Sequence, residues 1–184
     1  MTNDLTAKRL EILREIVPKL RRVIAFYNPR NRLALTSFQS TQAAARKFGI
    51  EVAAQQVANS EEVHERLRAL RAGDEDAFFF VGDLLVIVHT SPILETARTL
   101  RLPTMAIEAT AVRAGALVAY GPDFREYGRL PASYVARILA SSLPRDLPVE
   151  AINRPALTIN LKTATALGLT IPPEILLRAD EVIE

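Results

Sequence analysis

Two carboxylates and an amide stand directly after apolar segments of this sequence, where an α/β protein carries its ligand-binding groups. Asp83 follows AFFFV (77–81), Glu108 ends PTMAIE, and Asn28 closes the run RRVIAFYN. A carboxylate accepts hydrogen bonds from an ammonium or hydroxyl group, and an amide both donates and accepts. The same residue types also form turns by bonding to their own backbone, so both interpretations stay open at all three positions.

A second group of candidates lies in the stretch YGPD, where the pattern of the chain changes. Tyr120, Pro122 and Asp123 follow the apolar run ALVAY and precede a longer helical pattern. Such a change predicts a hinge, and hinge residues often line the cleft between two lobes. Tyr120 and Asp123 therefore join the candidate ligand-binding residues.

Residue types for covalent or metal chemistry are scarce. The chain has no Cys and only two His. His64 lies on a charged helical pattern, EEVHERLR, and His89 follows an apolar run, where a packing or capping role is favoured. The motifs GxGxxG, GxxxxGK, GxSxG and HExxH are all missing from the sequence. The sequence predicts no catalytic group, no metal and no cofactor, and hence no enzyme.

The composition excludes further classes of function. The 184 residues are 49% apolar and 24% charged, which is typical of one globular domain. The net charge of +2 and the scattering of Arg among Glu disfavour nucleic-acid binding. No apolar run reaches the length of a membrane span. The N-terminus lacks the pattern of a secretory signal, so we expect a cytoplasmic protein if Met1 is the natural start.

Apolar segments alternate with amphipathic ones along most of the chain. We expect Thr6 and Ser60 to cap two of the helices, and Gly128 and Pro131 to interrupt the early part of another. Residues 143–155 hold three prolines and predict an extended connection. The predicted helices cover 6–17, 35–48, 60–72, 92–100, 124–139 and 162–167, and the predicted strands lie within 21–29, 50–57, 77–81, 103–107, 116–120 and 157–160.

This alternation predicts the fold class. We expect an open, doubly wound parallel α/β sheet with helices on both faces. Ligands of such sheets bind beyond the carboxyl ends of the strands. The candidate residues all follow predicted strands, so we expect them along that one edge.

Four stretches of the sequence carry a family resemblance: AKRLEILREIVPKLRRVIAFYNP, AYGPDFREY, DLPVEA and INLKTATALGLTIPPEILLRADEVIE. Together they resemble ABC-transporter substrate-binding proteins of the group that binds tryptophan and other aromatic amino acids. The resemblance implies one lobe of a two-lobed protein of type I periplasmic-binding architecture. It also implies noncovalent binding of a small solute such as an amino acid, an ABC permease as partner, and a periplasmic or other extracytoplasmic location.

The resemblance covers only the C-terminal lobe. It implies a crossover helix (1–22), an α/β lobe (23–120), a hinge with a returning helix and a Pro-rich connection (121–155), and a closing strand with C-terminal helices (156–184). In the family the returning helix packs on the first lobe. We therefore expect a homodimer through residues 124–139, whose apolar face contains Tyr134, Val135, Ile138 and Leu139.

The resemblance also implies that Asn28, Asp83, Glu108 and Tyr120 line the cleft side of this lobe, with Asp83 binding a ligand ammonium. Leu84 and Arg32 replace prolines of the family's cleft-side loops, so the solutes of other family members carry over less directly to this chain. We expect weak ligand binding by this lobe alone. The alternative function is a ligand-sensing regulatory domain derived from a periplasmic binding protein.

Overall fold

A seven-stranded sheet forms the centre of the protein. The computed structural model describes residues 5–148 and 155–184. The strand order is β2-β1-β3-β4-β5-β6-β7, and β1 to β5 are parallel. Strand β6 runs antiparallel to β5 and parallel to β7. The strands are β1 (Arg22–Tyr27), β2 (Glu51–Gln56), β3 (Ala77–Phe79), β4 (Thr104–Ala106), β5 (Val118–Pro122), β6 (Pro155–Asn160) and β7 (Glu181–Ile183).

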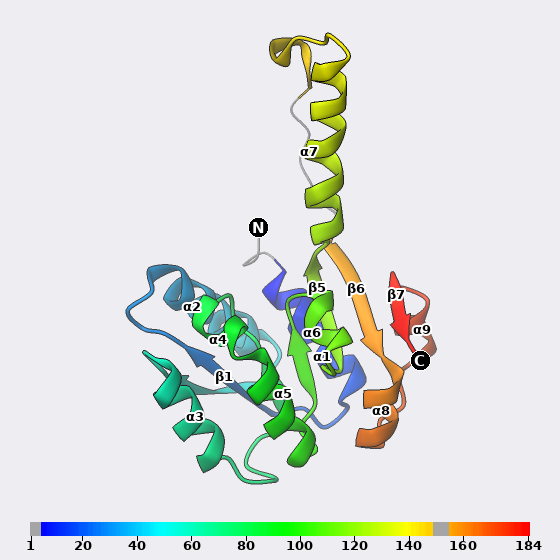
Figure 1. The fold of residues 1–184 in the computed structure, drawn as a ribbon. Coiled ribbons are helices and arrows are strands. Elements are labelled where there is room, and N and C mark those ends of the chain that lie inside the picture. The colour runs from blue at the N-terminus through cyan, green and yellow to red at the C-terminus, as the bar shows by residue number, and fades with distance from the viewer. Residues whose placement is uncertain (1–4, 149–154) are drawn as a thin grey trace.

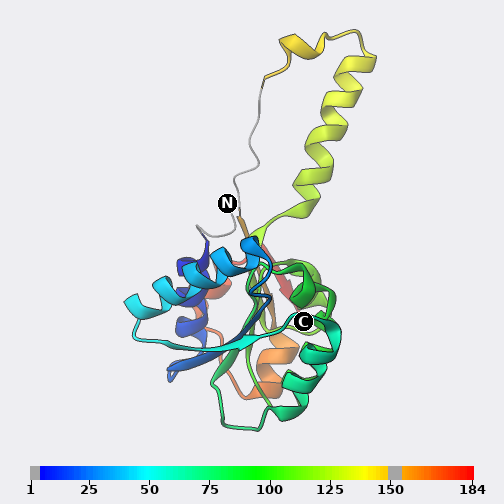
Figure 2. The same ribbon diagram turned by 90° about the vertical axis from the view of Figure 1, so that its left-hand side faces the viewer.

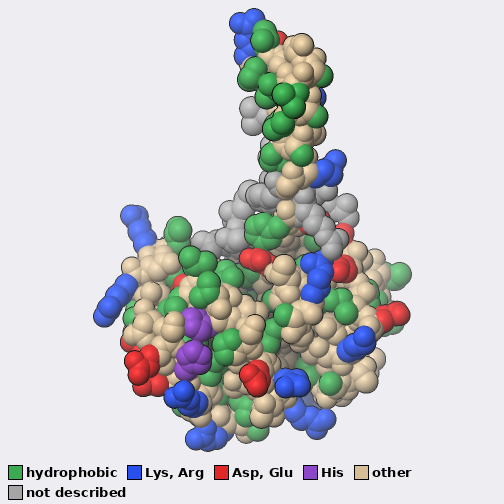
Figure 3. All heavy atoms as spheres, viewed as in Figure 1, with side chains coloured by type: hydrophobic (Ala, Val, Ile, Leu, Met, Phe, Trp, Pro, Cys, Tyr) green, Lys and Arg blue, Asp and Glu red, His purple; other side chains and the backbone are tan. Residues whose placement is uncertain are grey.

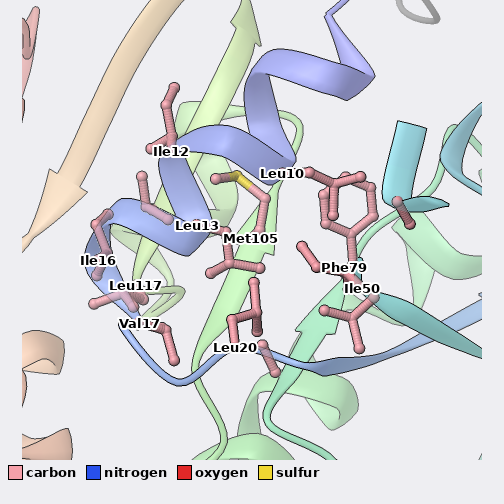
Figure 4. Packing of buried hydrophobic residues seen from close by; sticks show 14 of the residues in the cluster. Leu10, Ile12, Leu13, Ile16, Val17, Leu20, Ile50, Phe79, Met105 and Leu117 are labelled. Carbon is pink, nitrogen blue, oxygen red and sulfur yellow. The ribbon is translucent and has the colours of Figure 1, made fainter. Parts of the chain in front are cut away.

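Helices cover both faces of this sheet, which confirms the predicted fold class (Figure 1). On one face α1 buries Leu10 and Leu13 against Phe79 and Met105 of the central strands (Figure 4). Burying one such side chain stabilises the fold by about 1.5–3 kcal/mol. The helices are α1 (Thr6–Ile16), α2 (Arg32–Lys47), α3 (Ser60–Ala69), α4 (Leu84–Val88), α5 (Thr90–Thr99), α6 (Ala109–Arg113), α7 (Phe124–Leu139), α8 (Leu161–Leu167) and α9 (Pro173–Leu176), with a 3₁₀ turn at Pro144–Asp146.

The opposite face of the sheet carries a second apolar cluster. Ile24 and Phe78 of the strands pack with Val63 of α3, Ile93 of α5 and Val112 of α6. The strands between the two clusters are buried on both sides, since β1 has five consecutive buried residues and β3 has three. Continuous apolar strands of this kind are typical of parallel sheets.

Both predicted helix caps are wrong by one residue. Asn59 caps α3 by accepting from Glu62 N at 2.9 Å, and Glu62 accepts in return from Ala58 N at 2.8 Å. Ser60 is therefore the first residue of the helix. Thr6 is buried inside the first turn of α1, where its hydroxyl accepts from Arg9, and the cap position is Leu5.

The interruption predicted at Gly128 and Pro131 is also wrong. Helix α7 is continuous over its 16 residues with Pro131 inside it. One proline removes one backbone hydrogen bond but keeps a helical φ angle, so the helix persists around it. Helices α4 and α6 and strand β7 were not expected from the sequence.

The chain enters, leaves and re-enters the sheet at one edge. Figures 1 and 2 show that the start of α1, the end of β5 and the start of β6 all lie at this edge, and that α7 projects from it away from the sheet. It is the edge at which the parallel strands β1 to β5 end. The predicted connection 143–155 lies partly outside the described residues, at 149–154.

Candidate functional site

The candidate residues follow four neighbouring strands along the carboxyl edge of the sheet. Asn28 follows β1, Asp83 follows β3, Glu108 follows β4, and Asp123 follows β5. Because these strands are adjacent in the order β1-β3-β4-β5, the four residues form one continuous row. Their placement agrees with the expectation that polar groups gather at this edge.

Asp83 joins two loops of this edge. Its Oδ2 accepts from the backbone N–H of Asn28, and its Oδ1 accepts from Leu85 N at 3.0 Å, which caps α4. Only 1% of the residue is exposed. In this structure the turn-forming interpretation therefore holds for Asp83, whereas contact with a ligand ammonium stays a prediction.

Asn28 is half-buried next to Asp83. Its Oδ1 accepts from Arg30 N at 2.9 Å, which closes a short turn after β1. Among the described residues, no partner contacts its Nδ2 group. That group is a hydrogen-bond donor at the carboxyl edge of the sheet, the proposed cleft edge.

One further contact holds the β3–α4 loop in place. Gly82 N donates to Ser37 Oγ of α2 at 2.9 Å. A Cβ atom at Gly82 would lie 3.2 Å from that same oxygen, so glycine gives the closest approach. The loop is thus fixed to α2 by Ser37 and to the β1–α2 turn by Asp83, which leaves a preformed edge rather than a loose one.

Glu108 lies between two pockets at the end of β4. One pocket has a volume of about 320 Å³ and extends towards the base of α7, where it contains Asp123 and Phe124. The other, of about 260 Å³, extends towards α4 and α5 and contains Phe80 and Ile87. Both contain Glu108 and Thr110, and the Thr110 hydroxyl donates to Glu108 Oε2 at 3.2 Å. Glu108 is half-buried and thus accessible to a ligand from either side.

Among the described residues, the pocket at the base of α7 carries more carboxylates than cations. Arg113 pairs with Glu181 through Nε and Oε1 at 3.0 Å. Asp180 accepts from the backbone N–H of Leu157 at 2.9 Å. The remaining carboxylates of the pocket are Glu108 and Asp123. The balance of charge favours a ligand with a positive group.

Gly121 sets the floor of the same pocket. A Cβ atom at this position would lie 2.1 Å from the backbone oxygen of Ile107, which no side chain can occupy. The glycine therefore lets the end of β5 approach the end of β4. That close approach brings Asp123 into the pocket that contains Glu108.

Tyr120 lies apart from these groups. Its side chain is half-buried against the apolar cluster on the α1 face of the sheet. The structure thus brings together Asn28 with Asp83, and Glu108 with Asp123. It places Tyr120 within β5 but outside both pockets.

Arg9 is a functional candidate that the sequence did not reveal. The side chain is 1% exposed, stacks 5.1 Å above the ring of Phe79, and donates to the backbone oxygen of Phe80 at 3.0 Å. Burial lowers the pKa of Arg9 to about 10. Because Phe80 immediately precedes the loop 81–83, Arg9 connects helix α1 with the carboxyl edge of the sheet. Its helical pattern resembled that of a surface arginine.

Thr110, Ser37 and Phe124 were also missed by sequence reasoning. Thr110 follows Glu108 by two residues, a spacing that places a hydroxyl near the carboxylate in a helical first turn, and this signal was available in the sequence. Ser37 contacts Gly82 across 45 positions, and no local pattern encodes such a contact. Phe124 was assigned to a helix without a role in the cleft.

Two classes of site are not found in the part of the chain that the structure describes. Residues 5–148 and 155–184 contain no cluster of three His, Asp or Glu side chains suited to a metal ion. Among the same residues, no helix combines the length and the apolar character that crossing a bilayer requires.

Comparison with known proteins identifies the family. A model of the family described as ABC transporter substrate binding protein matches residues 2–183. The chain belongs to this family. Its members bind substrates and do not convert them.

Individual relatives support the same assignment. The tyrosine-binding protein of Clostridioides difficile (strain R20291) is 25% identical over 162 residues, which are 88% of this chain and 47% of that protein. A conserved domain protein from Vibrio cholerae O1 biovar El Tor is 27% identical with a TM-score of 0.80, covering 96% of this chain and 60% of that one. An ABC domain from Streptococcus pneumonia in complex with L-Trp has a TM-score of 0.80 at 22% identity, covering 97% and 60%.

The chain spans about half the length of the tyrosine-binding relative and 60% of each of the two solved structures above. Its sheet and helices match the fold of the lobes of periplasmic binding proteins. The resemblance inferred from the sequence is confirmed at the level of the family and the fold.

Proposed function

We propose that this chain forms the second lobe of a two-lobed solute-binding protein that serves an ABC importer. The supporting observation is that the three connections of the chain and the polar row of the strand ends share one edge (Figures 1 and 2). A second lobe attached through these connections would face the row from Asn28 to Asp123. The solute would then bind noncovalently between the two lobes, and no bond would be made or broken.

Exposed apolar side chains at the same edge support this proposal. Leu33 at the start of α2 is 78% exposed, and Leu84 and Val88 of α4 are 69% and 65% exposed. Phe124, at the base of α7, is 53% exposed. Large apolar side chains gathered at one edge indicate a surface that another body covers. A companion lobe with its solute fits the position of this edge.

We infer that the solute is an amino acid whose ammonium group binds to Glu108. This carboxylate is half-buried and accepts a hydrogen bond from Thr110 alone among the described residues. A charge-assisted hydrogen bond between the two groups is worth about 1.5–3 kcal/mol. The names of two similar proteins, which bind tyrosine and L-Trp, agree with an amino-acid solute. Asp83 then has the role of fixing the loops rather than binding the ammonium.

The remaining partners follow from the family. We propose that the closed, solute-bound form docks on an ABC permease and that the protein works outside the cytoplasm. Helix α7 packs on the companion lobe in this account. When the chain is studied alone, we propose that a second copy packs on α7, which gives a homodimer.

Amide chemical shifts of the isotope-labelled chain test this proposal. Titration with tyrosine or tryptophan should move the resonances of residues 80–91 and 107–124, while glucose should move neither set. Glu108→Gln should weaken the amino-acid effect about tenfold or more, because one charge-assisted hydrogen bond is lost. Glu65→Gln, which removes an exposed carboxylate from α3 outside the row, is the matched control. Shifts that glucose reproduces, or that Glu108→Gln leaves unchanged, would contradict the proposal.

A further inference from the structure

A further pocket lies at the other edge of the sheet. It has a volume of about 480 Å³, within the range of small-molecule sites. Its walls are one side of α5, residues 101–102, the start of β4, residues 114–115 after α6, and one side of α8. Since β4 begins at Thr104, this groove lies at the amino edge, and it shares only Ser91 and Ala114 with the smaller pocket that contains Glu108.

The groove carries a net positive charge. Arg98, Arg101 and Lys162 line it together with one carboxylate, Glu95. Among the described residues, none of these four side chains forms an ion pair. Apolar walls from Leu94, Ala97, Leu102 and Leu167 complete the groove. In the view of Figure 3, Lys and Arg side chains gather along the lower margin of this face of the molecule. Unpaired cations around an apolar wall fit a ligand with an anionic head and an apolar body.

The backbone at Arg101 supplies an independent observation. Helix α5 ends with two hydrogen bonds, from Arg101 N to Arg98 O at 3.2 Å and from Leu102 N to Ala97 O at 2.8 Å. This pattern requires a left-handed residue, and Arg101 has a φ of 55°. Glycine is the usual residue there, because a side chain is strained in that conformation.

Other helices of the same chain show what the position ordinarily contains. Helices α2, α6 and α8 end with the same pair of hydrogen bonds, and Gly49, Gly115 and Gly168 occupy the left-handed position. Helix α7 also ends with this pair, and there the small residue Ser141 has a φ of 78°. At the groove the chain has an arginine instead, at the expense of backbone strain. The Arg101 side chain extends from this point to α8, where Nη2 donates to Ala166 O at 3.3 Å. The guanidinium is thus placed across the groove with further donors left for an anion.

We propose that this groove is a second binding site, for a small organic anion with an apolar body. The anionic head binds to Arg101 with support from Arg98 and Lys162, and the body lies on the apolar wall of α5 and α8. The site is independent of the cleft row, so it does not depend on the proposed amino-acid solute.

Amide chemical shifts of the chain with two matched probes test the site. The probes are 4-phenylbutyrate and its uncharged amide, 4-phenylbutyramide. The carboxylate should give saturable shifts in residues 91–102 and 162–167. The amide should bind with an affinity at least about tenfold lower, because it lacks the charge. Added salt should weaken only the carboxylate.

Three variants separate a binding role from a structural one. Arg101→Gly should retain or raise the melting temperature, since glycine adopts the left-handed conformation without strain, yet lose about tenfold or more in carboxylate affinity. Lys162→Gln should also weaken binding. Lys47→Gln changes the net charge equally but lies on α2, so its binding should be unaltered. The proposal is overturned if the carboxylate causes no saturable shifts, if the amide binds equally well, or if Arg101→Gly only lowers stability.

Discussion

At the scale of single residues, the cleft edge depends on Asp83, whose two oxygens accept from the backbone N–H groups of Asn28 and Leu85. The loops after β1 and β3 are thereby joined before any solute arrives. Glu108, in contrast, is engaged by a single hydroxyl and stays accessible. Two carboxylates in equivalent positions therefore differ in role because their surroundings differ.

Removing the Asp83 carboxylate should destabilise the protein. Asp83→Ala loses the cap of α4 and leaves the N–H group of Asn28 without its partner, which together are worth about 2–4 kcal/mol. Asp83→Asn should be intermediate, because its one amide oxygen satisfies one of the two donors. Denaturant unfolding measures the free energies, with the exposed Glu65→Ala as a control near zero. An Asp83→Ala variant as stable as the parent chain would contradict this role.

Glu75 gives a prediction about pH. Burial raises its pKa above the ordinary 4.5, and Arg22, whose Nε lies 3.0 Å from Oε2, opposes this only in part. A carboxyl group with a raised pKa in the folded state destabilises that state, relative to the unfolded chain, when it is charged. The protein therefore loses stability as the pH rises from 4.5 through that raised pKa. Glu75→Gln should therefore raise the melting temperature at pH 7.

The effect of Glu75→Gln should vanish as the pH falls to 4.5 and below, because the parent carboxyl is then protonated too. Melting curves of both proteins across this window measure the difference. A lower melting temperature of the variant at pH 7 would show that the attraction to Arg22 outweighs the effect of burial.

At the scale of elements, α7 is the feature with no partner on the sheet. It projects from the cleft edge, and Figure 3 shows apolar side chains gathered on the projecting part. Val135 is 56% exposed, Ile138 41% and Leu139 81%. An amphipathic helix that exposes this face favours association, either with a companion lobe or with a second copy.

Charges on this face should prevent self-association. We expect Val135→Glu combined with Leu139→Glu to convert a dimer to a monomer at micromolar concentration, while the melting temperature of the sheet changes little because both side chains are exposed. Size-exclusion chromatography with light scattering measures the mass. Ser133→Glu on the same helix is a control of equal sign. A parent chain that is already monomeric would contradict the proposed homodimer.

Most elements could be predicted from the sequence where the local signal was strong. The alternation of apolar strands and amphipathic helices indicated the sheet and its two covered faces. Helix α4 was missed because its sequence LLVIV has no polar period, and exposed Leu84 and Val88 do not fit a core pattern. Strand β7 was missed because three residues give too short a pattern.

The candidate site was predictable in its location but not in its contacts. The row of Asn28, Asp83, Glu108 and Asp123 follows from the rule that ligands bind at strand ends. Which carboxylate is free follows from contacts between distant segments, such as the bond of Asp83 to Asn28 across 55 positions. Buried Arg9 is the clearest failure, since its guanidinium stacks on Phe79 and donates to the backbone oxygen of Phe80 across 71 positions, in addition to its local bond to Thr6.

At the scale of the whole molecule, we propose that this chain forms one half of a binding cleft. The polar row, the exposed apolar side chains and the three connections all lie at the same edge, and the chain spans 47% of a tyrosine-binding relative. A half-cleft offers a solute few contacts and does not exclude water. Closure by a second lobe would supply both, and excluding water strengthens the polar contacts that remain.

The measurement that tests this account most directly is calorimetric titration of tyrosine and tryptophan into two proteins, the chain alone and the chain joined to a first lobe. The account predicts submicromolar binding by the two-lobed protein and binding at least about a hundredfold weaker by the chain alone, a difference of about 2.7 kcal/mol. Equal submicromolar affinity of both proteins would contradict it, because the lobe described here would then be a complete binding site.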